Sequence, residues 1–158
     1  AGREAAQTAA HTKFGWNAAA ASTAVERLTT TLNMNSKGEI PANLLEQNLQ
    51  DVMWEKAGPF RTADQLQEAL DGIRKIHNTA SAVRPPDAFN LDLQDRLELK
   101  AMLITAEAVV RAAIGRTESR GAHQRLDYPD SNSGLARSQV IEMEDDALLV
   151  RWCNQGRP

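Results

Sequence analysis

Three segments of the chain repeat apolar residues at helical spacing, and these repeats restrict the possible fold more than any other feature. Residues three and four positions apart lie on one face of an α-helix. The repeating residues are Leu45, Leu49, Val52 and Met53 in the first segment, Leu66, Leu70, Ile73 and Ile76 in the second, and Leu99, Met102, Leu103, Ala106, Val110, Ala113 and Ile114 in the third. Because the connections between the segments are short, the three helices are predicted to pack antiparallel as a bundle.

Turn and capping residues predict where these helices begin and end. Pro41 suits the first turn of the first helix, and the Gly-Pro pair at 58–59 suits its end. Residues 62–65 spell T-x-x-Q, a capping box that opens the second helix, and Arg-Pro-Pro at 84–86 ends it. The third helix, which has the broadest apolar face, is predicted over about 92–119.

The two flanks of the bundle have different compositions. Residues 1–35 are rich in alanine and contain no proline, which predicts a linking helix, broken near Gly15, that leans on something larger. Residues 131–158 include "RSQVIEME" and "ALLVRWC", which predict two strands around an "EDDA" turn. The fold class is therefore mostly α: a three-helix bundle resembling a spectrin repeat over 36–130, preceded by a linking helix and followed by a short C-terminal β-hairpin.

Composition excludes several classes of function. The 158 residues carry a net charge of −3 and only 4% aromatic residues, which argues against a nucleic-acid partner or an anionic membrane surface. No apolar run reaches the ~18 residues that cross a bilayer, so direct membrane insertion is not expected. The single cysteine excludes an internal disulfide and is compatible with the cytoplasm.

Motifs for metal, nucleotide or nucleophile chemistry do not occur in the sequence. His11, His77 and His123 show no metal-ligand spacing. No phosphate loop, dinucleotide glycine fingerprint or G-x-S-x-G elbow is present. We therefore expect no catalytic, cofactor-binding or metal-binding residue in this chain.

Four further residues have simpler predicted roles. Trp16, Trp54 and Trp152 are expected to be packing anchors, because large aromatic rings bury the most apolar area. Cys153 lies in an apolar strand and is expected to be a half-buried structural thiol.

The polar string "TESRGAHQRLDYPD", residues 117–130, follows the most apolar helix. Arg116 and Arg120 suit the negative end of a helix dipole, and Gly121 suits a left-handed helix stop. Between positions 111 and 137, five arginines meet three acids, a local excess of two positive charges. Arginines interleaved with acids favour bidentate pairs in a docking surface or structural network, while a catalytic constellation and a solvated helix cap remain open.

The same string resembles the C-terminal signature of the flavoprotein subunits of succinate dehydrogenase and fumarate reductase, and L-aspartate oxidase carries a similar one. Residues 53–76 resemble the first helix junction of that family's C-terminal domain, residues 91–121 its long last helix, and "AGREAA" the end of the flavin domain's last helix. The matching signature residues are Glu118, Ser119, Arg120, Gly121, Ala122, His123, Arg125, Asp127, Tyr128 and Pro129. Leu126 departs, because the dehydrogenases and reductases usually have an acid there, whereas aspartate oxidases can carry an apolar residue. Ala122 favours the dehydrogenase side.

The resemblance implies that the chemistry of the parent protein lies outside this chain. In the family, a flavin domain and a capping domain precede this region and carry the flavin contacts, the substrate-binding residues and the proton-transferring arginine. This chain would then be the C-terminal domain of an FAD-dependent oxidoreductase that moves a hydride between flavin N5 and a dicarboxylate. It would contain no FAD itself.

The resemblance also implies partners and a location. The expected partners are the flavin domain of the same polypeptide and an iron–sulfur subunit. The expected location is cytoplasmic, or peripheral to the inner membrane through a complex. Detached from its parent, the chain is expected to expose an apolar patch on residues 1–32 and to self-associate.

Three other functions remain open at this point. The domain could belong to an L-aspartate oxidase-type enzyme, since Leu126 fits that branch. It could be a free-standing helical protein-interaction domain that keeps the signature only as a stabilising cap. It could also be a small enzyme, although it lacks a convergent acid, base or nucleophile.

Overall fold

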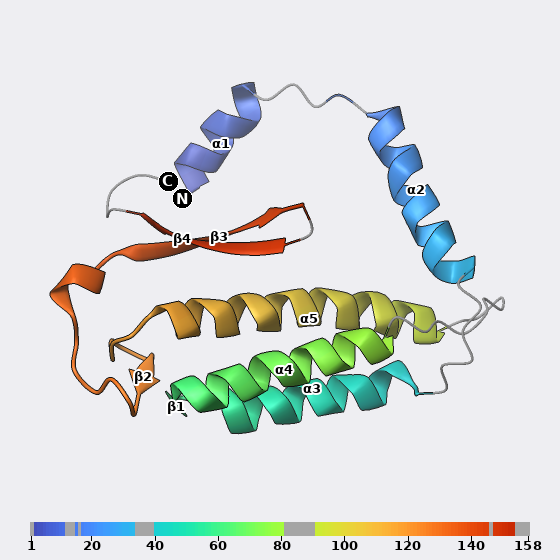
Figure 1. Cartoon of the computed structure of the whole chain (residues 1–158). Helices are drawn as coiled ribbons and strands as arrows, with labels where there is room; N and C mark the ends of the chain where they lie inside the picture. Colours follow the sequence, from blue (N-terminus) through green and yellow to red (C-terminus); the bar gives the residue numbers. More distant parts are fainter. Residues whose placement is uncertain are drawn as a thin grey trace.

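The bundle predicted from the apolar repeats is present. The structure is a computed structural model that describes residues 2–11, 15, 17–33, 40–80, 91–145 and 147–153. Its central helices are α3 (Ala42–Lys56), α4 (Ala63–Ala80) and α5 (Leu91–Gly115), and each contacts the other two (Figure 1). None of the described helices is both long enough and apolar enough to cross a membrane.

The predicted stripes form the core of the bundle. Its buried members are Leu45, Leu49, Ala57, Leu66, Ala69, Leu70, Ile73, Ile76, Leu99, Leu103, Ala106, Val110 and Ala113. The stripe residues Val52, Met53, Met102 and Ile114 are only partly buried and pack against this core. Periodicity therefore predicted the direction of the core correctly and misjudged only the edges of the first and third stripes.

The α3–α4 junction confirms the capping box and the helix stop at Gly58, and it corrects the prediction for Pro41. The amide of Thr62 donates to Oε1 of Gln65 at 3.0 Å, and the amide of Gln65 donates to Oγ1 of Thr62 at 3.3 Å. Pro41 is the residue before α3 and not part of its first turn. Gly58 follows the C-cap residue and is needed for space, because a Cβ there would lie 2.8 Å from the carbonyl oxygen of Trp54. The predicted stop at 84–86 lies outside the described residues.

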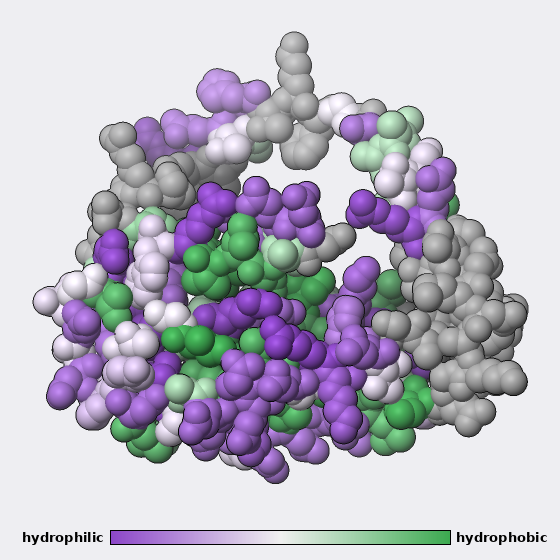
Figure 2. Space-filling model, in the orientation of Figure 1, coloured by the Kyte–Doolittle hydropathy of each residue, from purple (hydrophilic) through white to green (hydrophobic). Residues whose placement is uncertain are grey.

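The N-terminal flank forms two helices, α1 (Gly2–His11) and α2 (Ala18–Asn33), and not one continuous helix. The interruption includes Gly15, as the sequence predicted. Both helices stand away from the bundle (Figure 1), and their described side chains are exposed apart from half-buried Ala21. An open space between these helices and the rest of the molecule is visible in Figure 2.

The C-terminal flank is the predicted hairpin. Strands β3 (Ser138–Glu144) and β4 (Ala147–Cys153) pair antiparallel from Ser138↔Cys153 to Glu144↔Ala147, and both contact α5. A short 3₁₀ turn, η1 (Ser133–Leu135), precedes it. A second, unpredicted sheet joins β1 (Phe60–Arg61) to β2 (Gln124–Arg125) in parallel, with Arg61 opposite Arg125.

The predictions for the tryptophans and the cysteine have mixed outcomes. Trp54 is 80% exposed, so its prediction as a packing anchor was wrong; it lies on the outer side of α3, away from the core. Trp152 is half-buried, and Trp16 lies outside the described residues. Cys153 is half-buried, as predicted.

Replacing Leu66 with alanine tests how strongly the core holds the bundle. Leu66 is completely buried, so Leu66→Ala is expected to lower the free energy of unfolding by about 2–5 kcal/mol, because a cavity remains. Leu44→Ala is the matched control: Leu44 is 46% exposed on α3, and its loss should change stability by no more than about 0.5 kcal/mol. Urea unfolding followed by circular dichroism measures both, and equal losses would contradict the assigned core.

Candidate functional site

Glu118 is the buried centre of the polar string. Its side chain is completely inaccessible to solvent, and its two carboxylate oxygens accept four hydrogen bonds. Oε1 accepts from Nη1 of Arg116 at 2.6 Å and from Nε of Arg120 at 2.9 Å. Oε2 accepts from Nη2 of Arg120 at 2.9 Å and from the backbone amide of Asn132 at 2.7 Å. These bonds, that of Arg120 first, lower the pKa of Glu118 to about 2, so the group is ionised at neutral pH.

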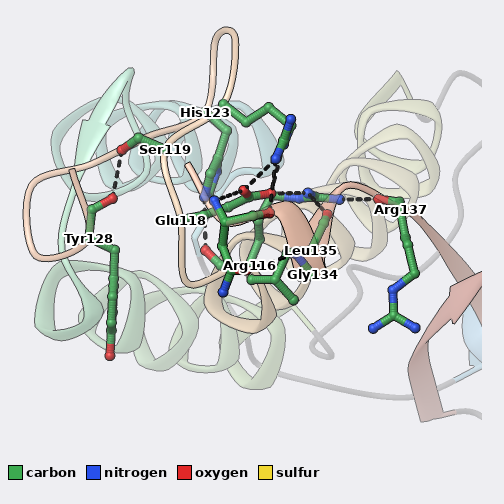
Figure 3. A network of polar contacts seen from close by, with 10 residues as sticks. Arg116, Glu118, Ser119, His123, Tyr128, Gly134, Leu135 and Arg137 are labelled. Atoms are coloured by element: carbon green, nitrogen blue, oxygen red, sulfur yellow. Dashed lines mark hydrogen bonds and ion pairs between the residues drawn. The ribbon is translucent and has the colours of Figure 1, made fainter. Parts of the chain in front are cut away.

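Arg116 connects this carboxylate to the C-terminal hairpin. Besides Glu118, its guanidinium donates to the carbonyl oxygens of Leu135 at 2.9 Å and Arg137 at 2.7 Å (Figure 3). It also lies over the indole ring of Trp152, 4.8 Å from the ring centroid. One side chain thus bonds the polar string to η1 and to the chain entering β3, and stacks on β4.

Ser119 closes the loop that follows α5. Its hydroxyl donates to the carbonyl oxygen of Tyr128 at 2.8 Å (Figure 3) and accepts from the amide of Arg125 at 2.9 Å. Its own amide donates to the carbonyl oxygen of Asp130 at 3.0 Å. The hydroxyl is fully engaged with backbone groups, and it is not paired with a histidine as a catalytic serine would be.

His123 lies at the far end of a tight turn. Arg120 and His123 exchange backbone hydrogen bonds across Gly121, whose φ of +58° is the left-handed conformation that glycine adopts readily. Nε2 of the histidine lies 3.0 Å from the carbonyl oxygen of Arg116, and partial burial lowers its pKa. A neutral ring would donate to that carbonyl through Nε2.

Arg125 and Asp127 join two helix ends. Arg125, only 2% exposed, forms a bidentate pair with Asp127, with Nε 2.7 Å from Oδ1 and Nη2 2.6 Å from Oδ2. Nη1 of Arg125 donates at 3.0 Å to the carbonyl oxygen of Ala113 in the last turn of α5. Oδ2 of Asp127 accepts at 2.9 Å from the amide of Ala63, the first residue of α4. The guanidinium also lies over the ring of Tyr128, 4.9 Å from its centroid.

The structure therefore corrects the predicted end of α5. The helix ends at Gly115, four residues before Ser119, so Arg116 and Arg120 lie beyond its last turn. Gly121 has the predicted left-handed conformation, but it forms the later turn and does not terminate the helix. The side chain of Arg125, from further along the chain, takes the carbonyl group of Ala113 in the last turn, so the helix ends without a glycine stop.

The predicted signature residues are brought together, but several of their partners were not predicted. The partners missed are the amide of Asn132, the carbonyl groups of Ala113, Leu135 and Arg137, the amide of Ala63, and the ring of Trp152. Most are backbone atoms, which carry no residue-type signal. Only Trp152 carried a residue-type signal, because it is an aromatic residue in a chain with few aromatic residues.

The arrangement provides ion pairs and helix caps, and the carboxylate of Glu118 and the hydroxyl of Ser119 are already occupied. The described residues contain no group of three or more histidine, cysteine, aspartate or glutamate side chains able to hold a metal ion. A groove of about 480 Å³ lies elsewhere, between α3 and α4, and the ion pair of Lys56 and Glu68 forms part of its lining. Fold and site together define a helical bundle closed by a structural ion-pair network.

Comparison with known proteins gives the family. The family model described as fumarate reductase flavoprotein C-term matches residues 46–153, more than half of the chain. This chain therefore belongs to the fumarate reductase flavoprotein C-terminal family, as the resemblance of the signature predicted.

Individual relatives agree with the family match. The chain is 34% identical to the fumarate reductase flavoprotein subunit of Mycobacterium tuberculosis over 85% of its own length and 24% of the relative's. It is 35% identical to the succinate dehydrogenase flavoprotein subunit of Rickettsia felis over 72% of its own length and 20% of the relative's. An E. coli quinol fumarate reductase structure matches 97% of this chain and 28% of its own, with 25% identity and a TM-score of 0.83. The chain thus spans about a quarter or less of the curated relatives it matches.

Replacing Glu118 with glutamine tests the centre of the network. Glu118→Gln removes the charge that pairs with two arginines, and breaking a buried pair in this way is expected to cost about 3–5 kcal/mol of unfolding free energy. Glu142→Gln is the control, because Glu142 is half exposed and pairs with Arg151 at 3.3 Å, a type of pair worth under about 1 kcal/mol. Chemical denaturation measures both, and a small loss for Glu118→Gln would contradict its central role.

The lowered pKa of Glu118 also predicts a pH dependence of stability. The folded state holds this carboxylate ionised down to about pH 2, whereas its ordinary pKa is 4.5. Its contribution is complete above the ordinary value and is lost as pH falls from about 4.5 to about 2, because the unfolded chain binds the proton first. Asp127, whose pKa is lowered chiefly by its bond to Arg125, acts in the same direction.

Unfolding free energies measured at a series of pH values test this. The unaltered chain should lose stability over that range, and Glu118→Gln should lose less because its group no longer titrates. Curves that stay parallel for the two proteins would show that Glu118 does not titrate with a shifted pKa.

Proposed function

We propose that this chain serves as the C-terminal helical domain of an FAD-dependent oxidoreductase acting on a dicarboxylate, and that it is structural and not catalytic. In this proposal residues 1–35 link to the flavin domain, residues 36–130 are the bundle with its signature, and residues 131–158 are the tail with the hairpin. The observation that carries the proposal is the state of Glu118: a fully buried carboxylate with four hydrogen bonds has no capacity left for a substrate.

The N-terminus of α4, which follows strand β1, does not fit the pyrophosphate of FAD. A flavin dinucleotide is usually held at a glycine-rich turn between a strand and a helix N-terminus, where its pyrophosphate meets free amides. At α4, the helix that follows β1, the first amide is bonded to Asp127 and the Thr62–Gln65 capping box occupies the same end. FAD is therefore proposed for the parent polypeptide, in agreement with relatives named as flavoprotein subunits.

The proposed partners are the flavin domain of the same polypeptide and an iron–sulfur subunit, in the cytoplasm or at the inner membrane through a complex. A partner with negative charge fits the signature best, because Arg116 and Arg120 share the single carboxylate of Glu118. Arg120 remains 41% exposed at the edge of this cluster. An arginine of this kind can receive a carboxylate from a partner without losing its first one.

One observation keeps the L-aspartate oxidase-type parent as a second candidate. Leu126, the residue that departs from the usual dehydrogenase signature, is 63% exposed, so the fold itself accepts an acid or an apolar residue there. Its identity can therefore follow the surface of the partner domain. An apolar residue at this position is the feature that the two branches do not share.

Flavin content tests the proposed function directly. The whole polypeptide encoded with this chain should purify with stoichiometric FAD, detected by visible absorbance, and the 158-residue chain alone should be colourless. The reading frame should also continue upstream into a flavin domain. A reading frame without one, or stoichiometric FAD on the isolated chain, would refute the proposal.

A further inference from the structure

Arg61 carries a positive charge that the described part of the chain does not balance. Its guanidinium forms no ion pair there, and its buried Nε has no hydrogen-bond partner among the same residues. The arginines of the polar string differ, because Arg120 and Arg125 are each paired with a carboxylate. A partly buried charge without a partner costs free energy, and an arginine cannot avoid that cost by losing its proton.

The strand pairing places Arg61 beside a second arginine. β1 and β2 run parallel at the end of the bundle where α4 begins (Figure 1), and Arg61 is the register partner of Arg125. Register partners lie on the same face of a sheet, with their strands about 4.8 Å apart. Phe60 and Leu126 take the other face and are mostly exposed, whereas Arg125 is buried and Arg61 is half-buried. Two like charges therefore share the inner face, an arrangement that is destabilising unless an opposite charge is present.

His123 reports how positive this region is. Burial lowers the pKa of its ring most, and the charges of Arg61, Arg125 and Arg116 lower it further. The pKa of Arg61 is itself lowered, first by burial and then by the charge of Arg125. The positive charges of three arginines thus act on one histidine ring.

The charges of this region do not cancel. Two carboxylates face four guanidinium groups, which leaves an excess of two positive charges; the groups are Glu118 and Asp127 against Arg61, Arg116, Arg120 and Arg125. The guanidinium of Arg125 already uses all three of its nitrogens in hydrogen bonds. Arg61 is therefore the group that can donate to a further anion, and its planar fork matches two oxygens of a phosphate or carboxylate.

We infer that Arg61 binds a small oxyanion with two negative charges, such as hydrogen phosphate, on the face that it shares with Arg125 and His123. The anion accepts hydrogen bonds from the Nη nitrogens of Arg61, and Arg125 contributes its charge. Because Arg61 is half-buried, a small ion reaches these nitrogens more easily than a carboxylate on the surface of a folded partner. The site consists of this chain's own residues, so the inference does not rest on the proposed function.

Thermal unfolding of the 158-residue chain in sodium phosphate tests the inference, with sodium chloride at the same pH and ionic strength as the reference. A ligand that binds only the folded chain raises the unfolding midpoint as its concentration increases. Arg61→Gln removes charge-assisted hydrogen bonds to the anion, so phosphate binding should weaken roughly tenfold or more. The midpoint of this variant should therefore rise much less than that of the unaltered chain.

Arg111→Gln is the matched control. Arg111 is a partly exposed arginine of α5 that pairs with Glu107 at 2.7 Å, away from the polar string. The variant loses the same charge as Arg61→Gln, and its midpoint should rise with phosphate as in the unaltered chain. Phosphate also stabilises folded proteins because it is excluded from their surface, and all three proteins share that effect.

The ring of His123, followed by NMR as pH changes, gives a second measurement. Bound phosphate should raise the pKa of this ring in the unaltered chain, because a nearby negative charge favours the imidazolium. The exposed ring of His77 in α4 should keep its pKa in phosphate and in chloride. In chloride alone, Arg61→Gln should raise the pKa of His123, because one of the three positive charges is lost.

Three results would overturn the inference. The first is an equal phosphate effect on the midpoints of the unaltered chain and Arg61→Gln. The second is a pKa of His123 that phosphate leaves unchanged in the unaltered chain, a result that does not depend on the folding of any variant. The third is an equal effect of sodium acetate at the same ionic strength, which would show that a doubly charged ion is not preferred.

Discussion

The ion pair of Arg125 and Asp127 connects the end of α5 to the start of α4, and the rest of the structure depends on this connection. A buried guanidinium costs several kcal/mol unless it is paired and hydrogen-bonded, and Arg125 meets that cost with a bidentate carboxylate and a helix carbonyl. Its carboxylate partner caps the start of α4, so a single ion pair fixes the end of one helix against the beginning of another. The parallel pairing of β1 and β2 runs alongside this pair, and Leu126 continues it with a bond to the carbonyl of Arg61.

The serine, histidine, arginines and acids of the polar string could suggest an active site, and in the structure they bond to one another and to the backbone. Glu118 and Asp127 have lowered pKa values, so near neutral pH neither has a proton to donate. The pKa of His123 is also lowered, and the ring already has a backbone partner. These residues are bound to the protein's own backbone at helix ends and turns, which supports the proposed structural role.

The sequence predicted what depends on periodicity and local capping, and it missed what depends on long-range backbone contacts. Leu66, Ile73, Leu99 and Val110 were identified as core because helical spacing alone places them on one face. Thr62 and Gln65 were identified because a capping box is local. The end of α5 was misplaced because a guanidinium twelve residues away takes the carbonyl of Ala113. Trp54 was misjudged because size predicts packing only where a neighbouring element is present to cover the ring.

The bond between Ala63 and Asp127 spans 64 residues of chain, and this separation bears on the order of folding. Closing so long a loop before the bundle forms would cost chain entropy with little compensation, whereas the α3–α4 hairpin closes locally. The helices are therefore expected to associate first, and the signature to join them last. The contacts of the signature are therefore expected to form after the rate-limiting step of folding. Weakening them should mainly speed unfolding and leave the folding rate nearly unchanged.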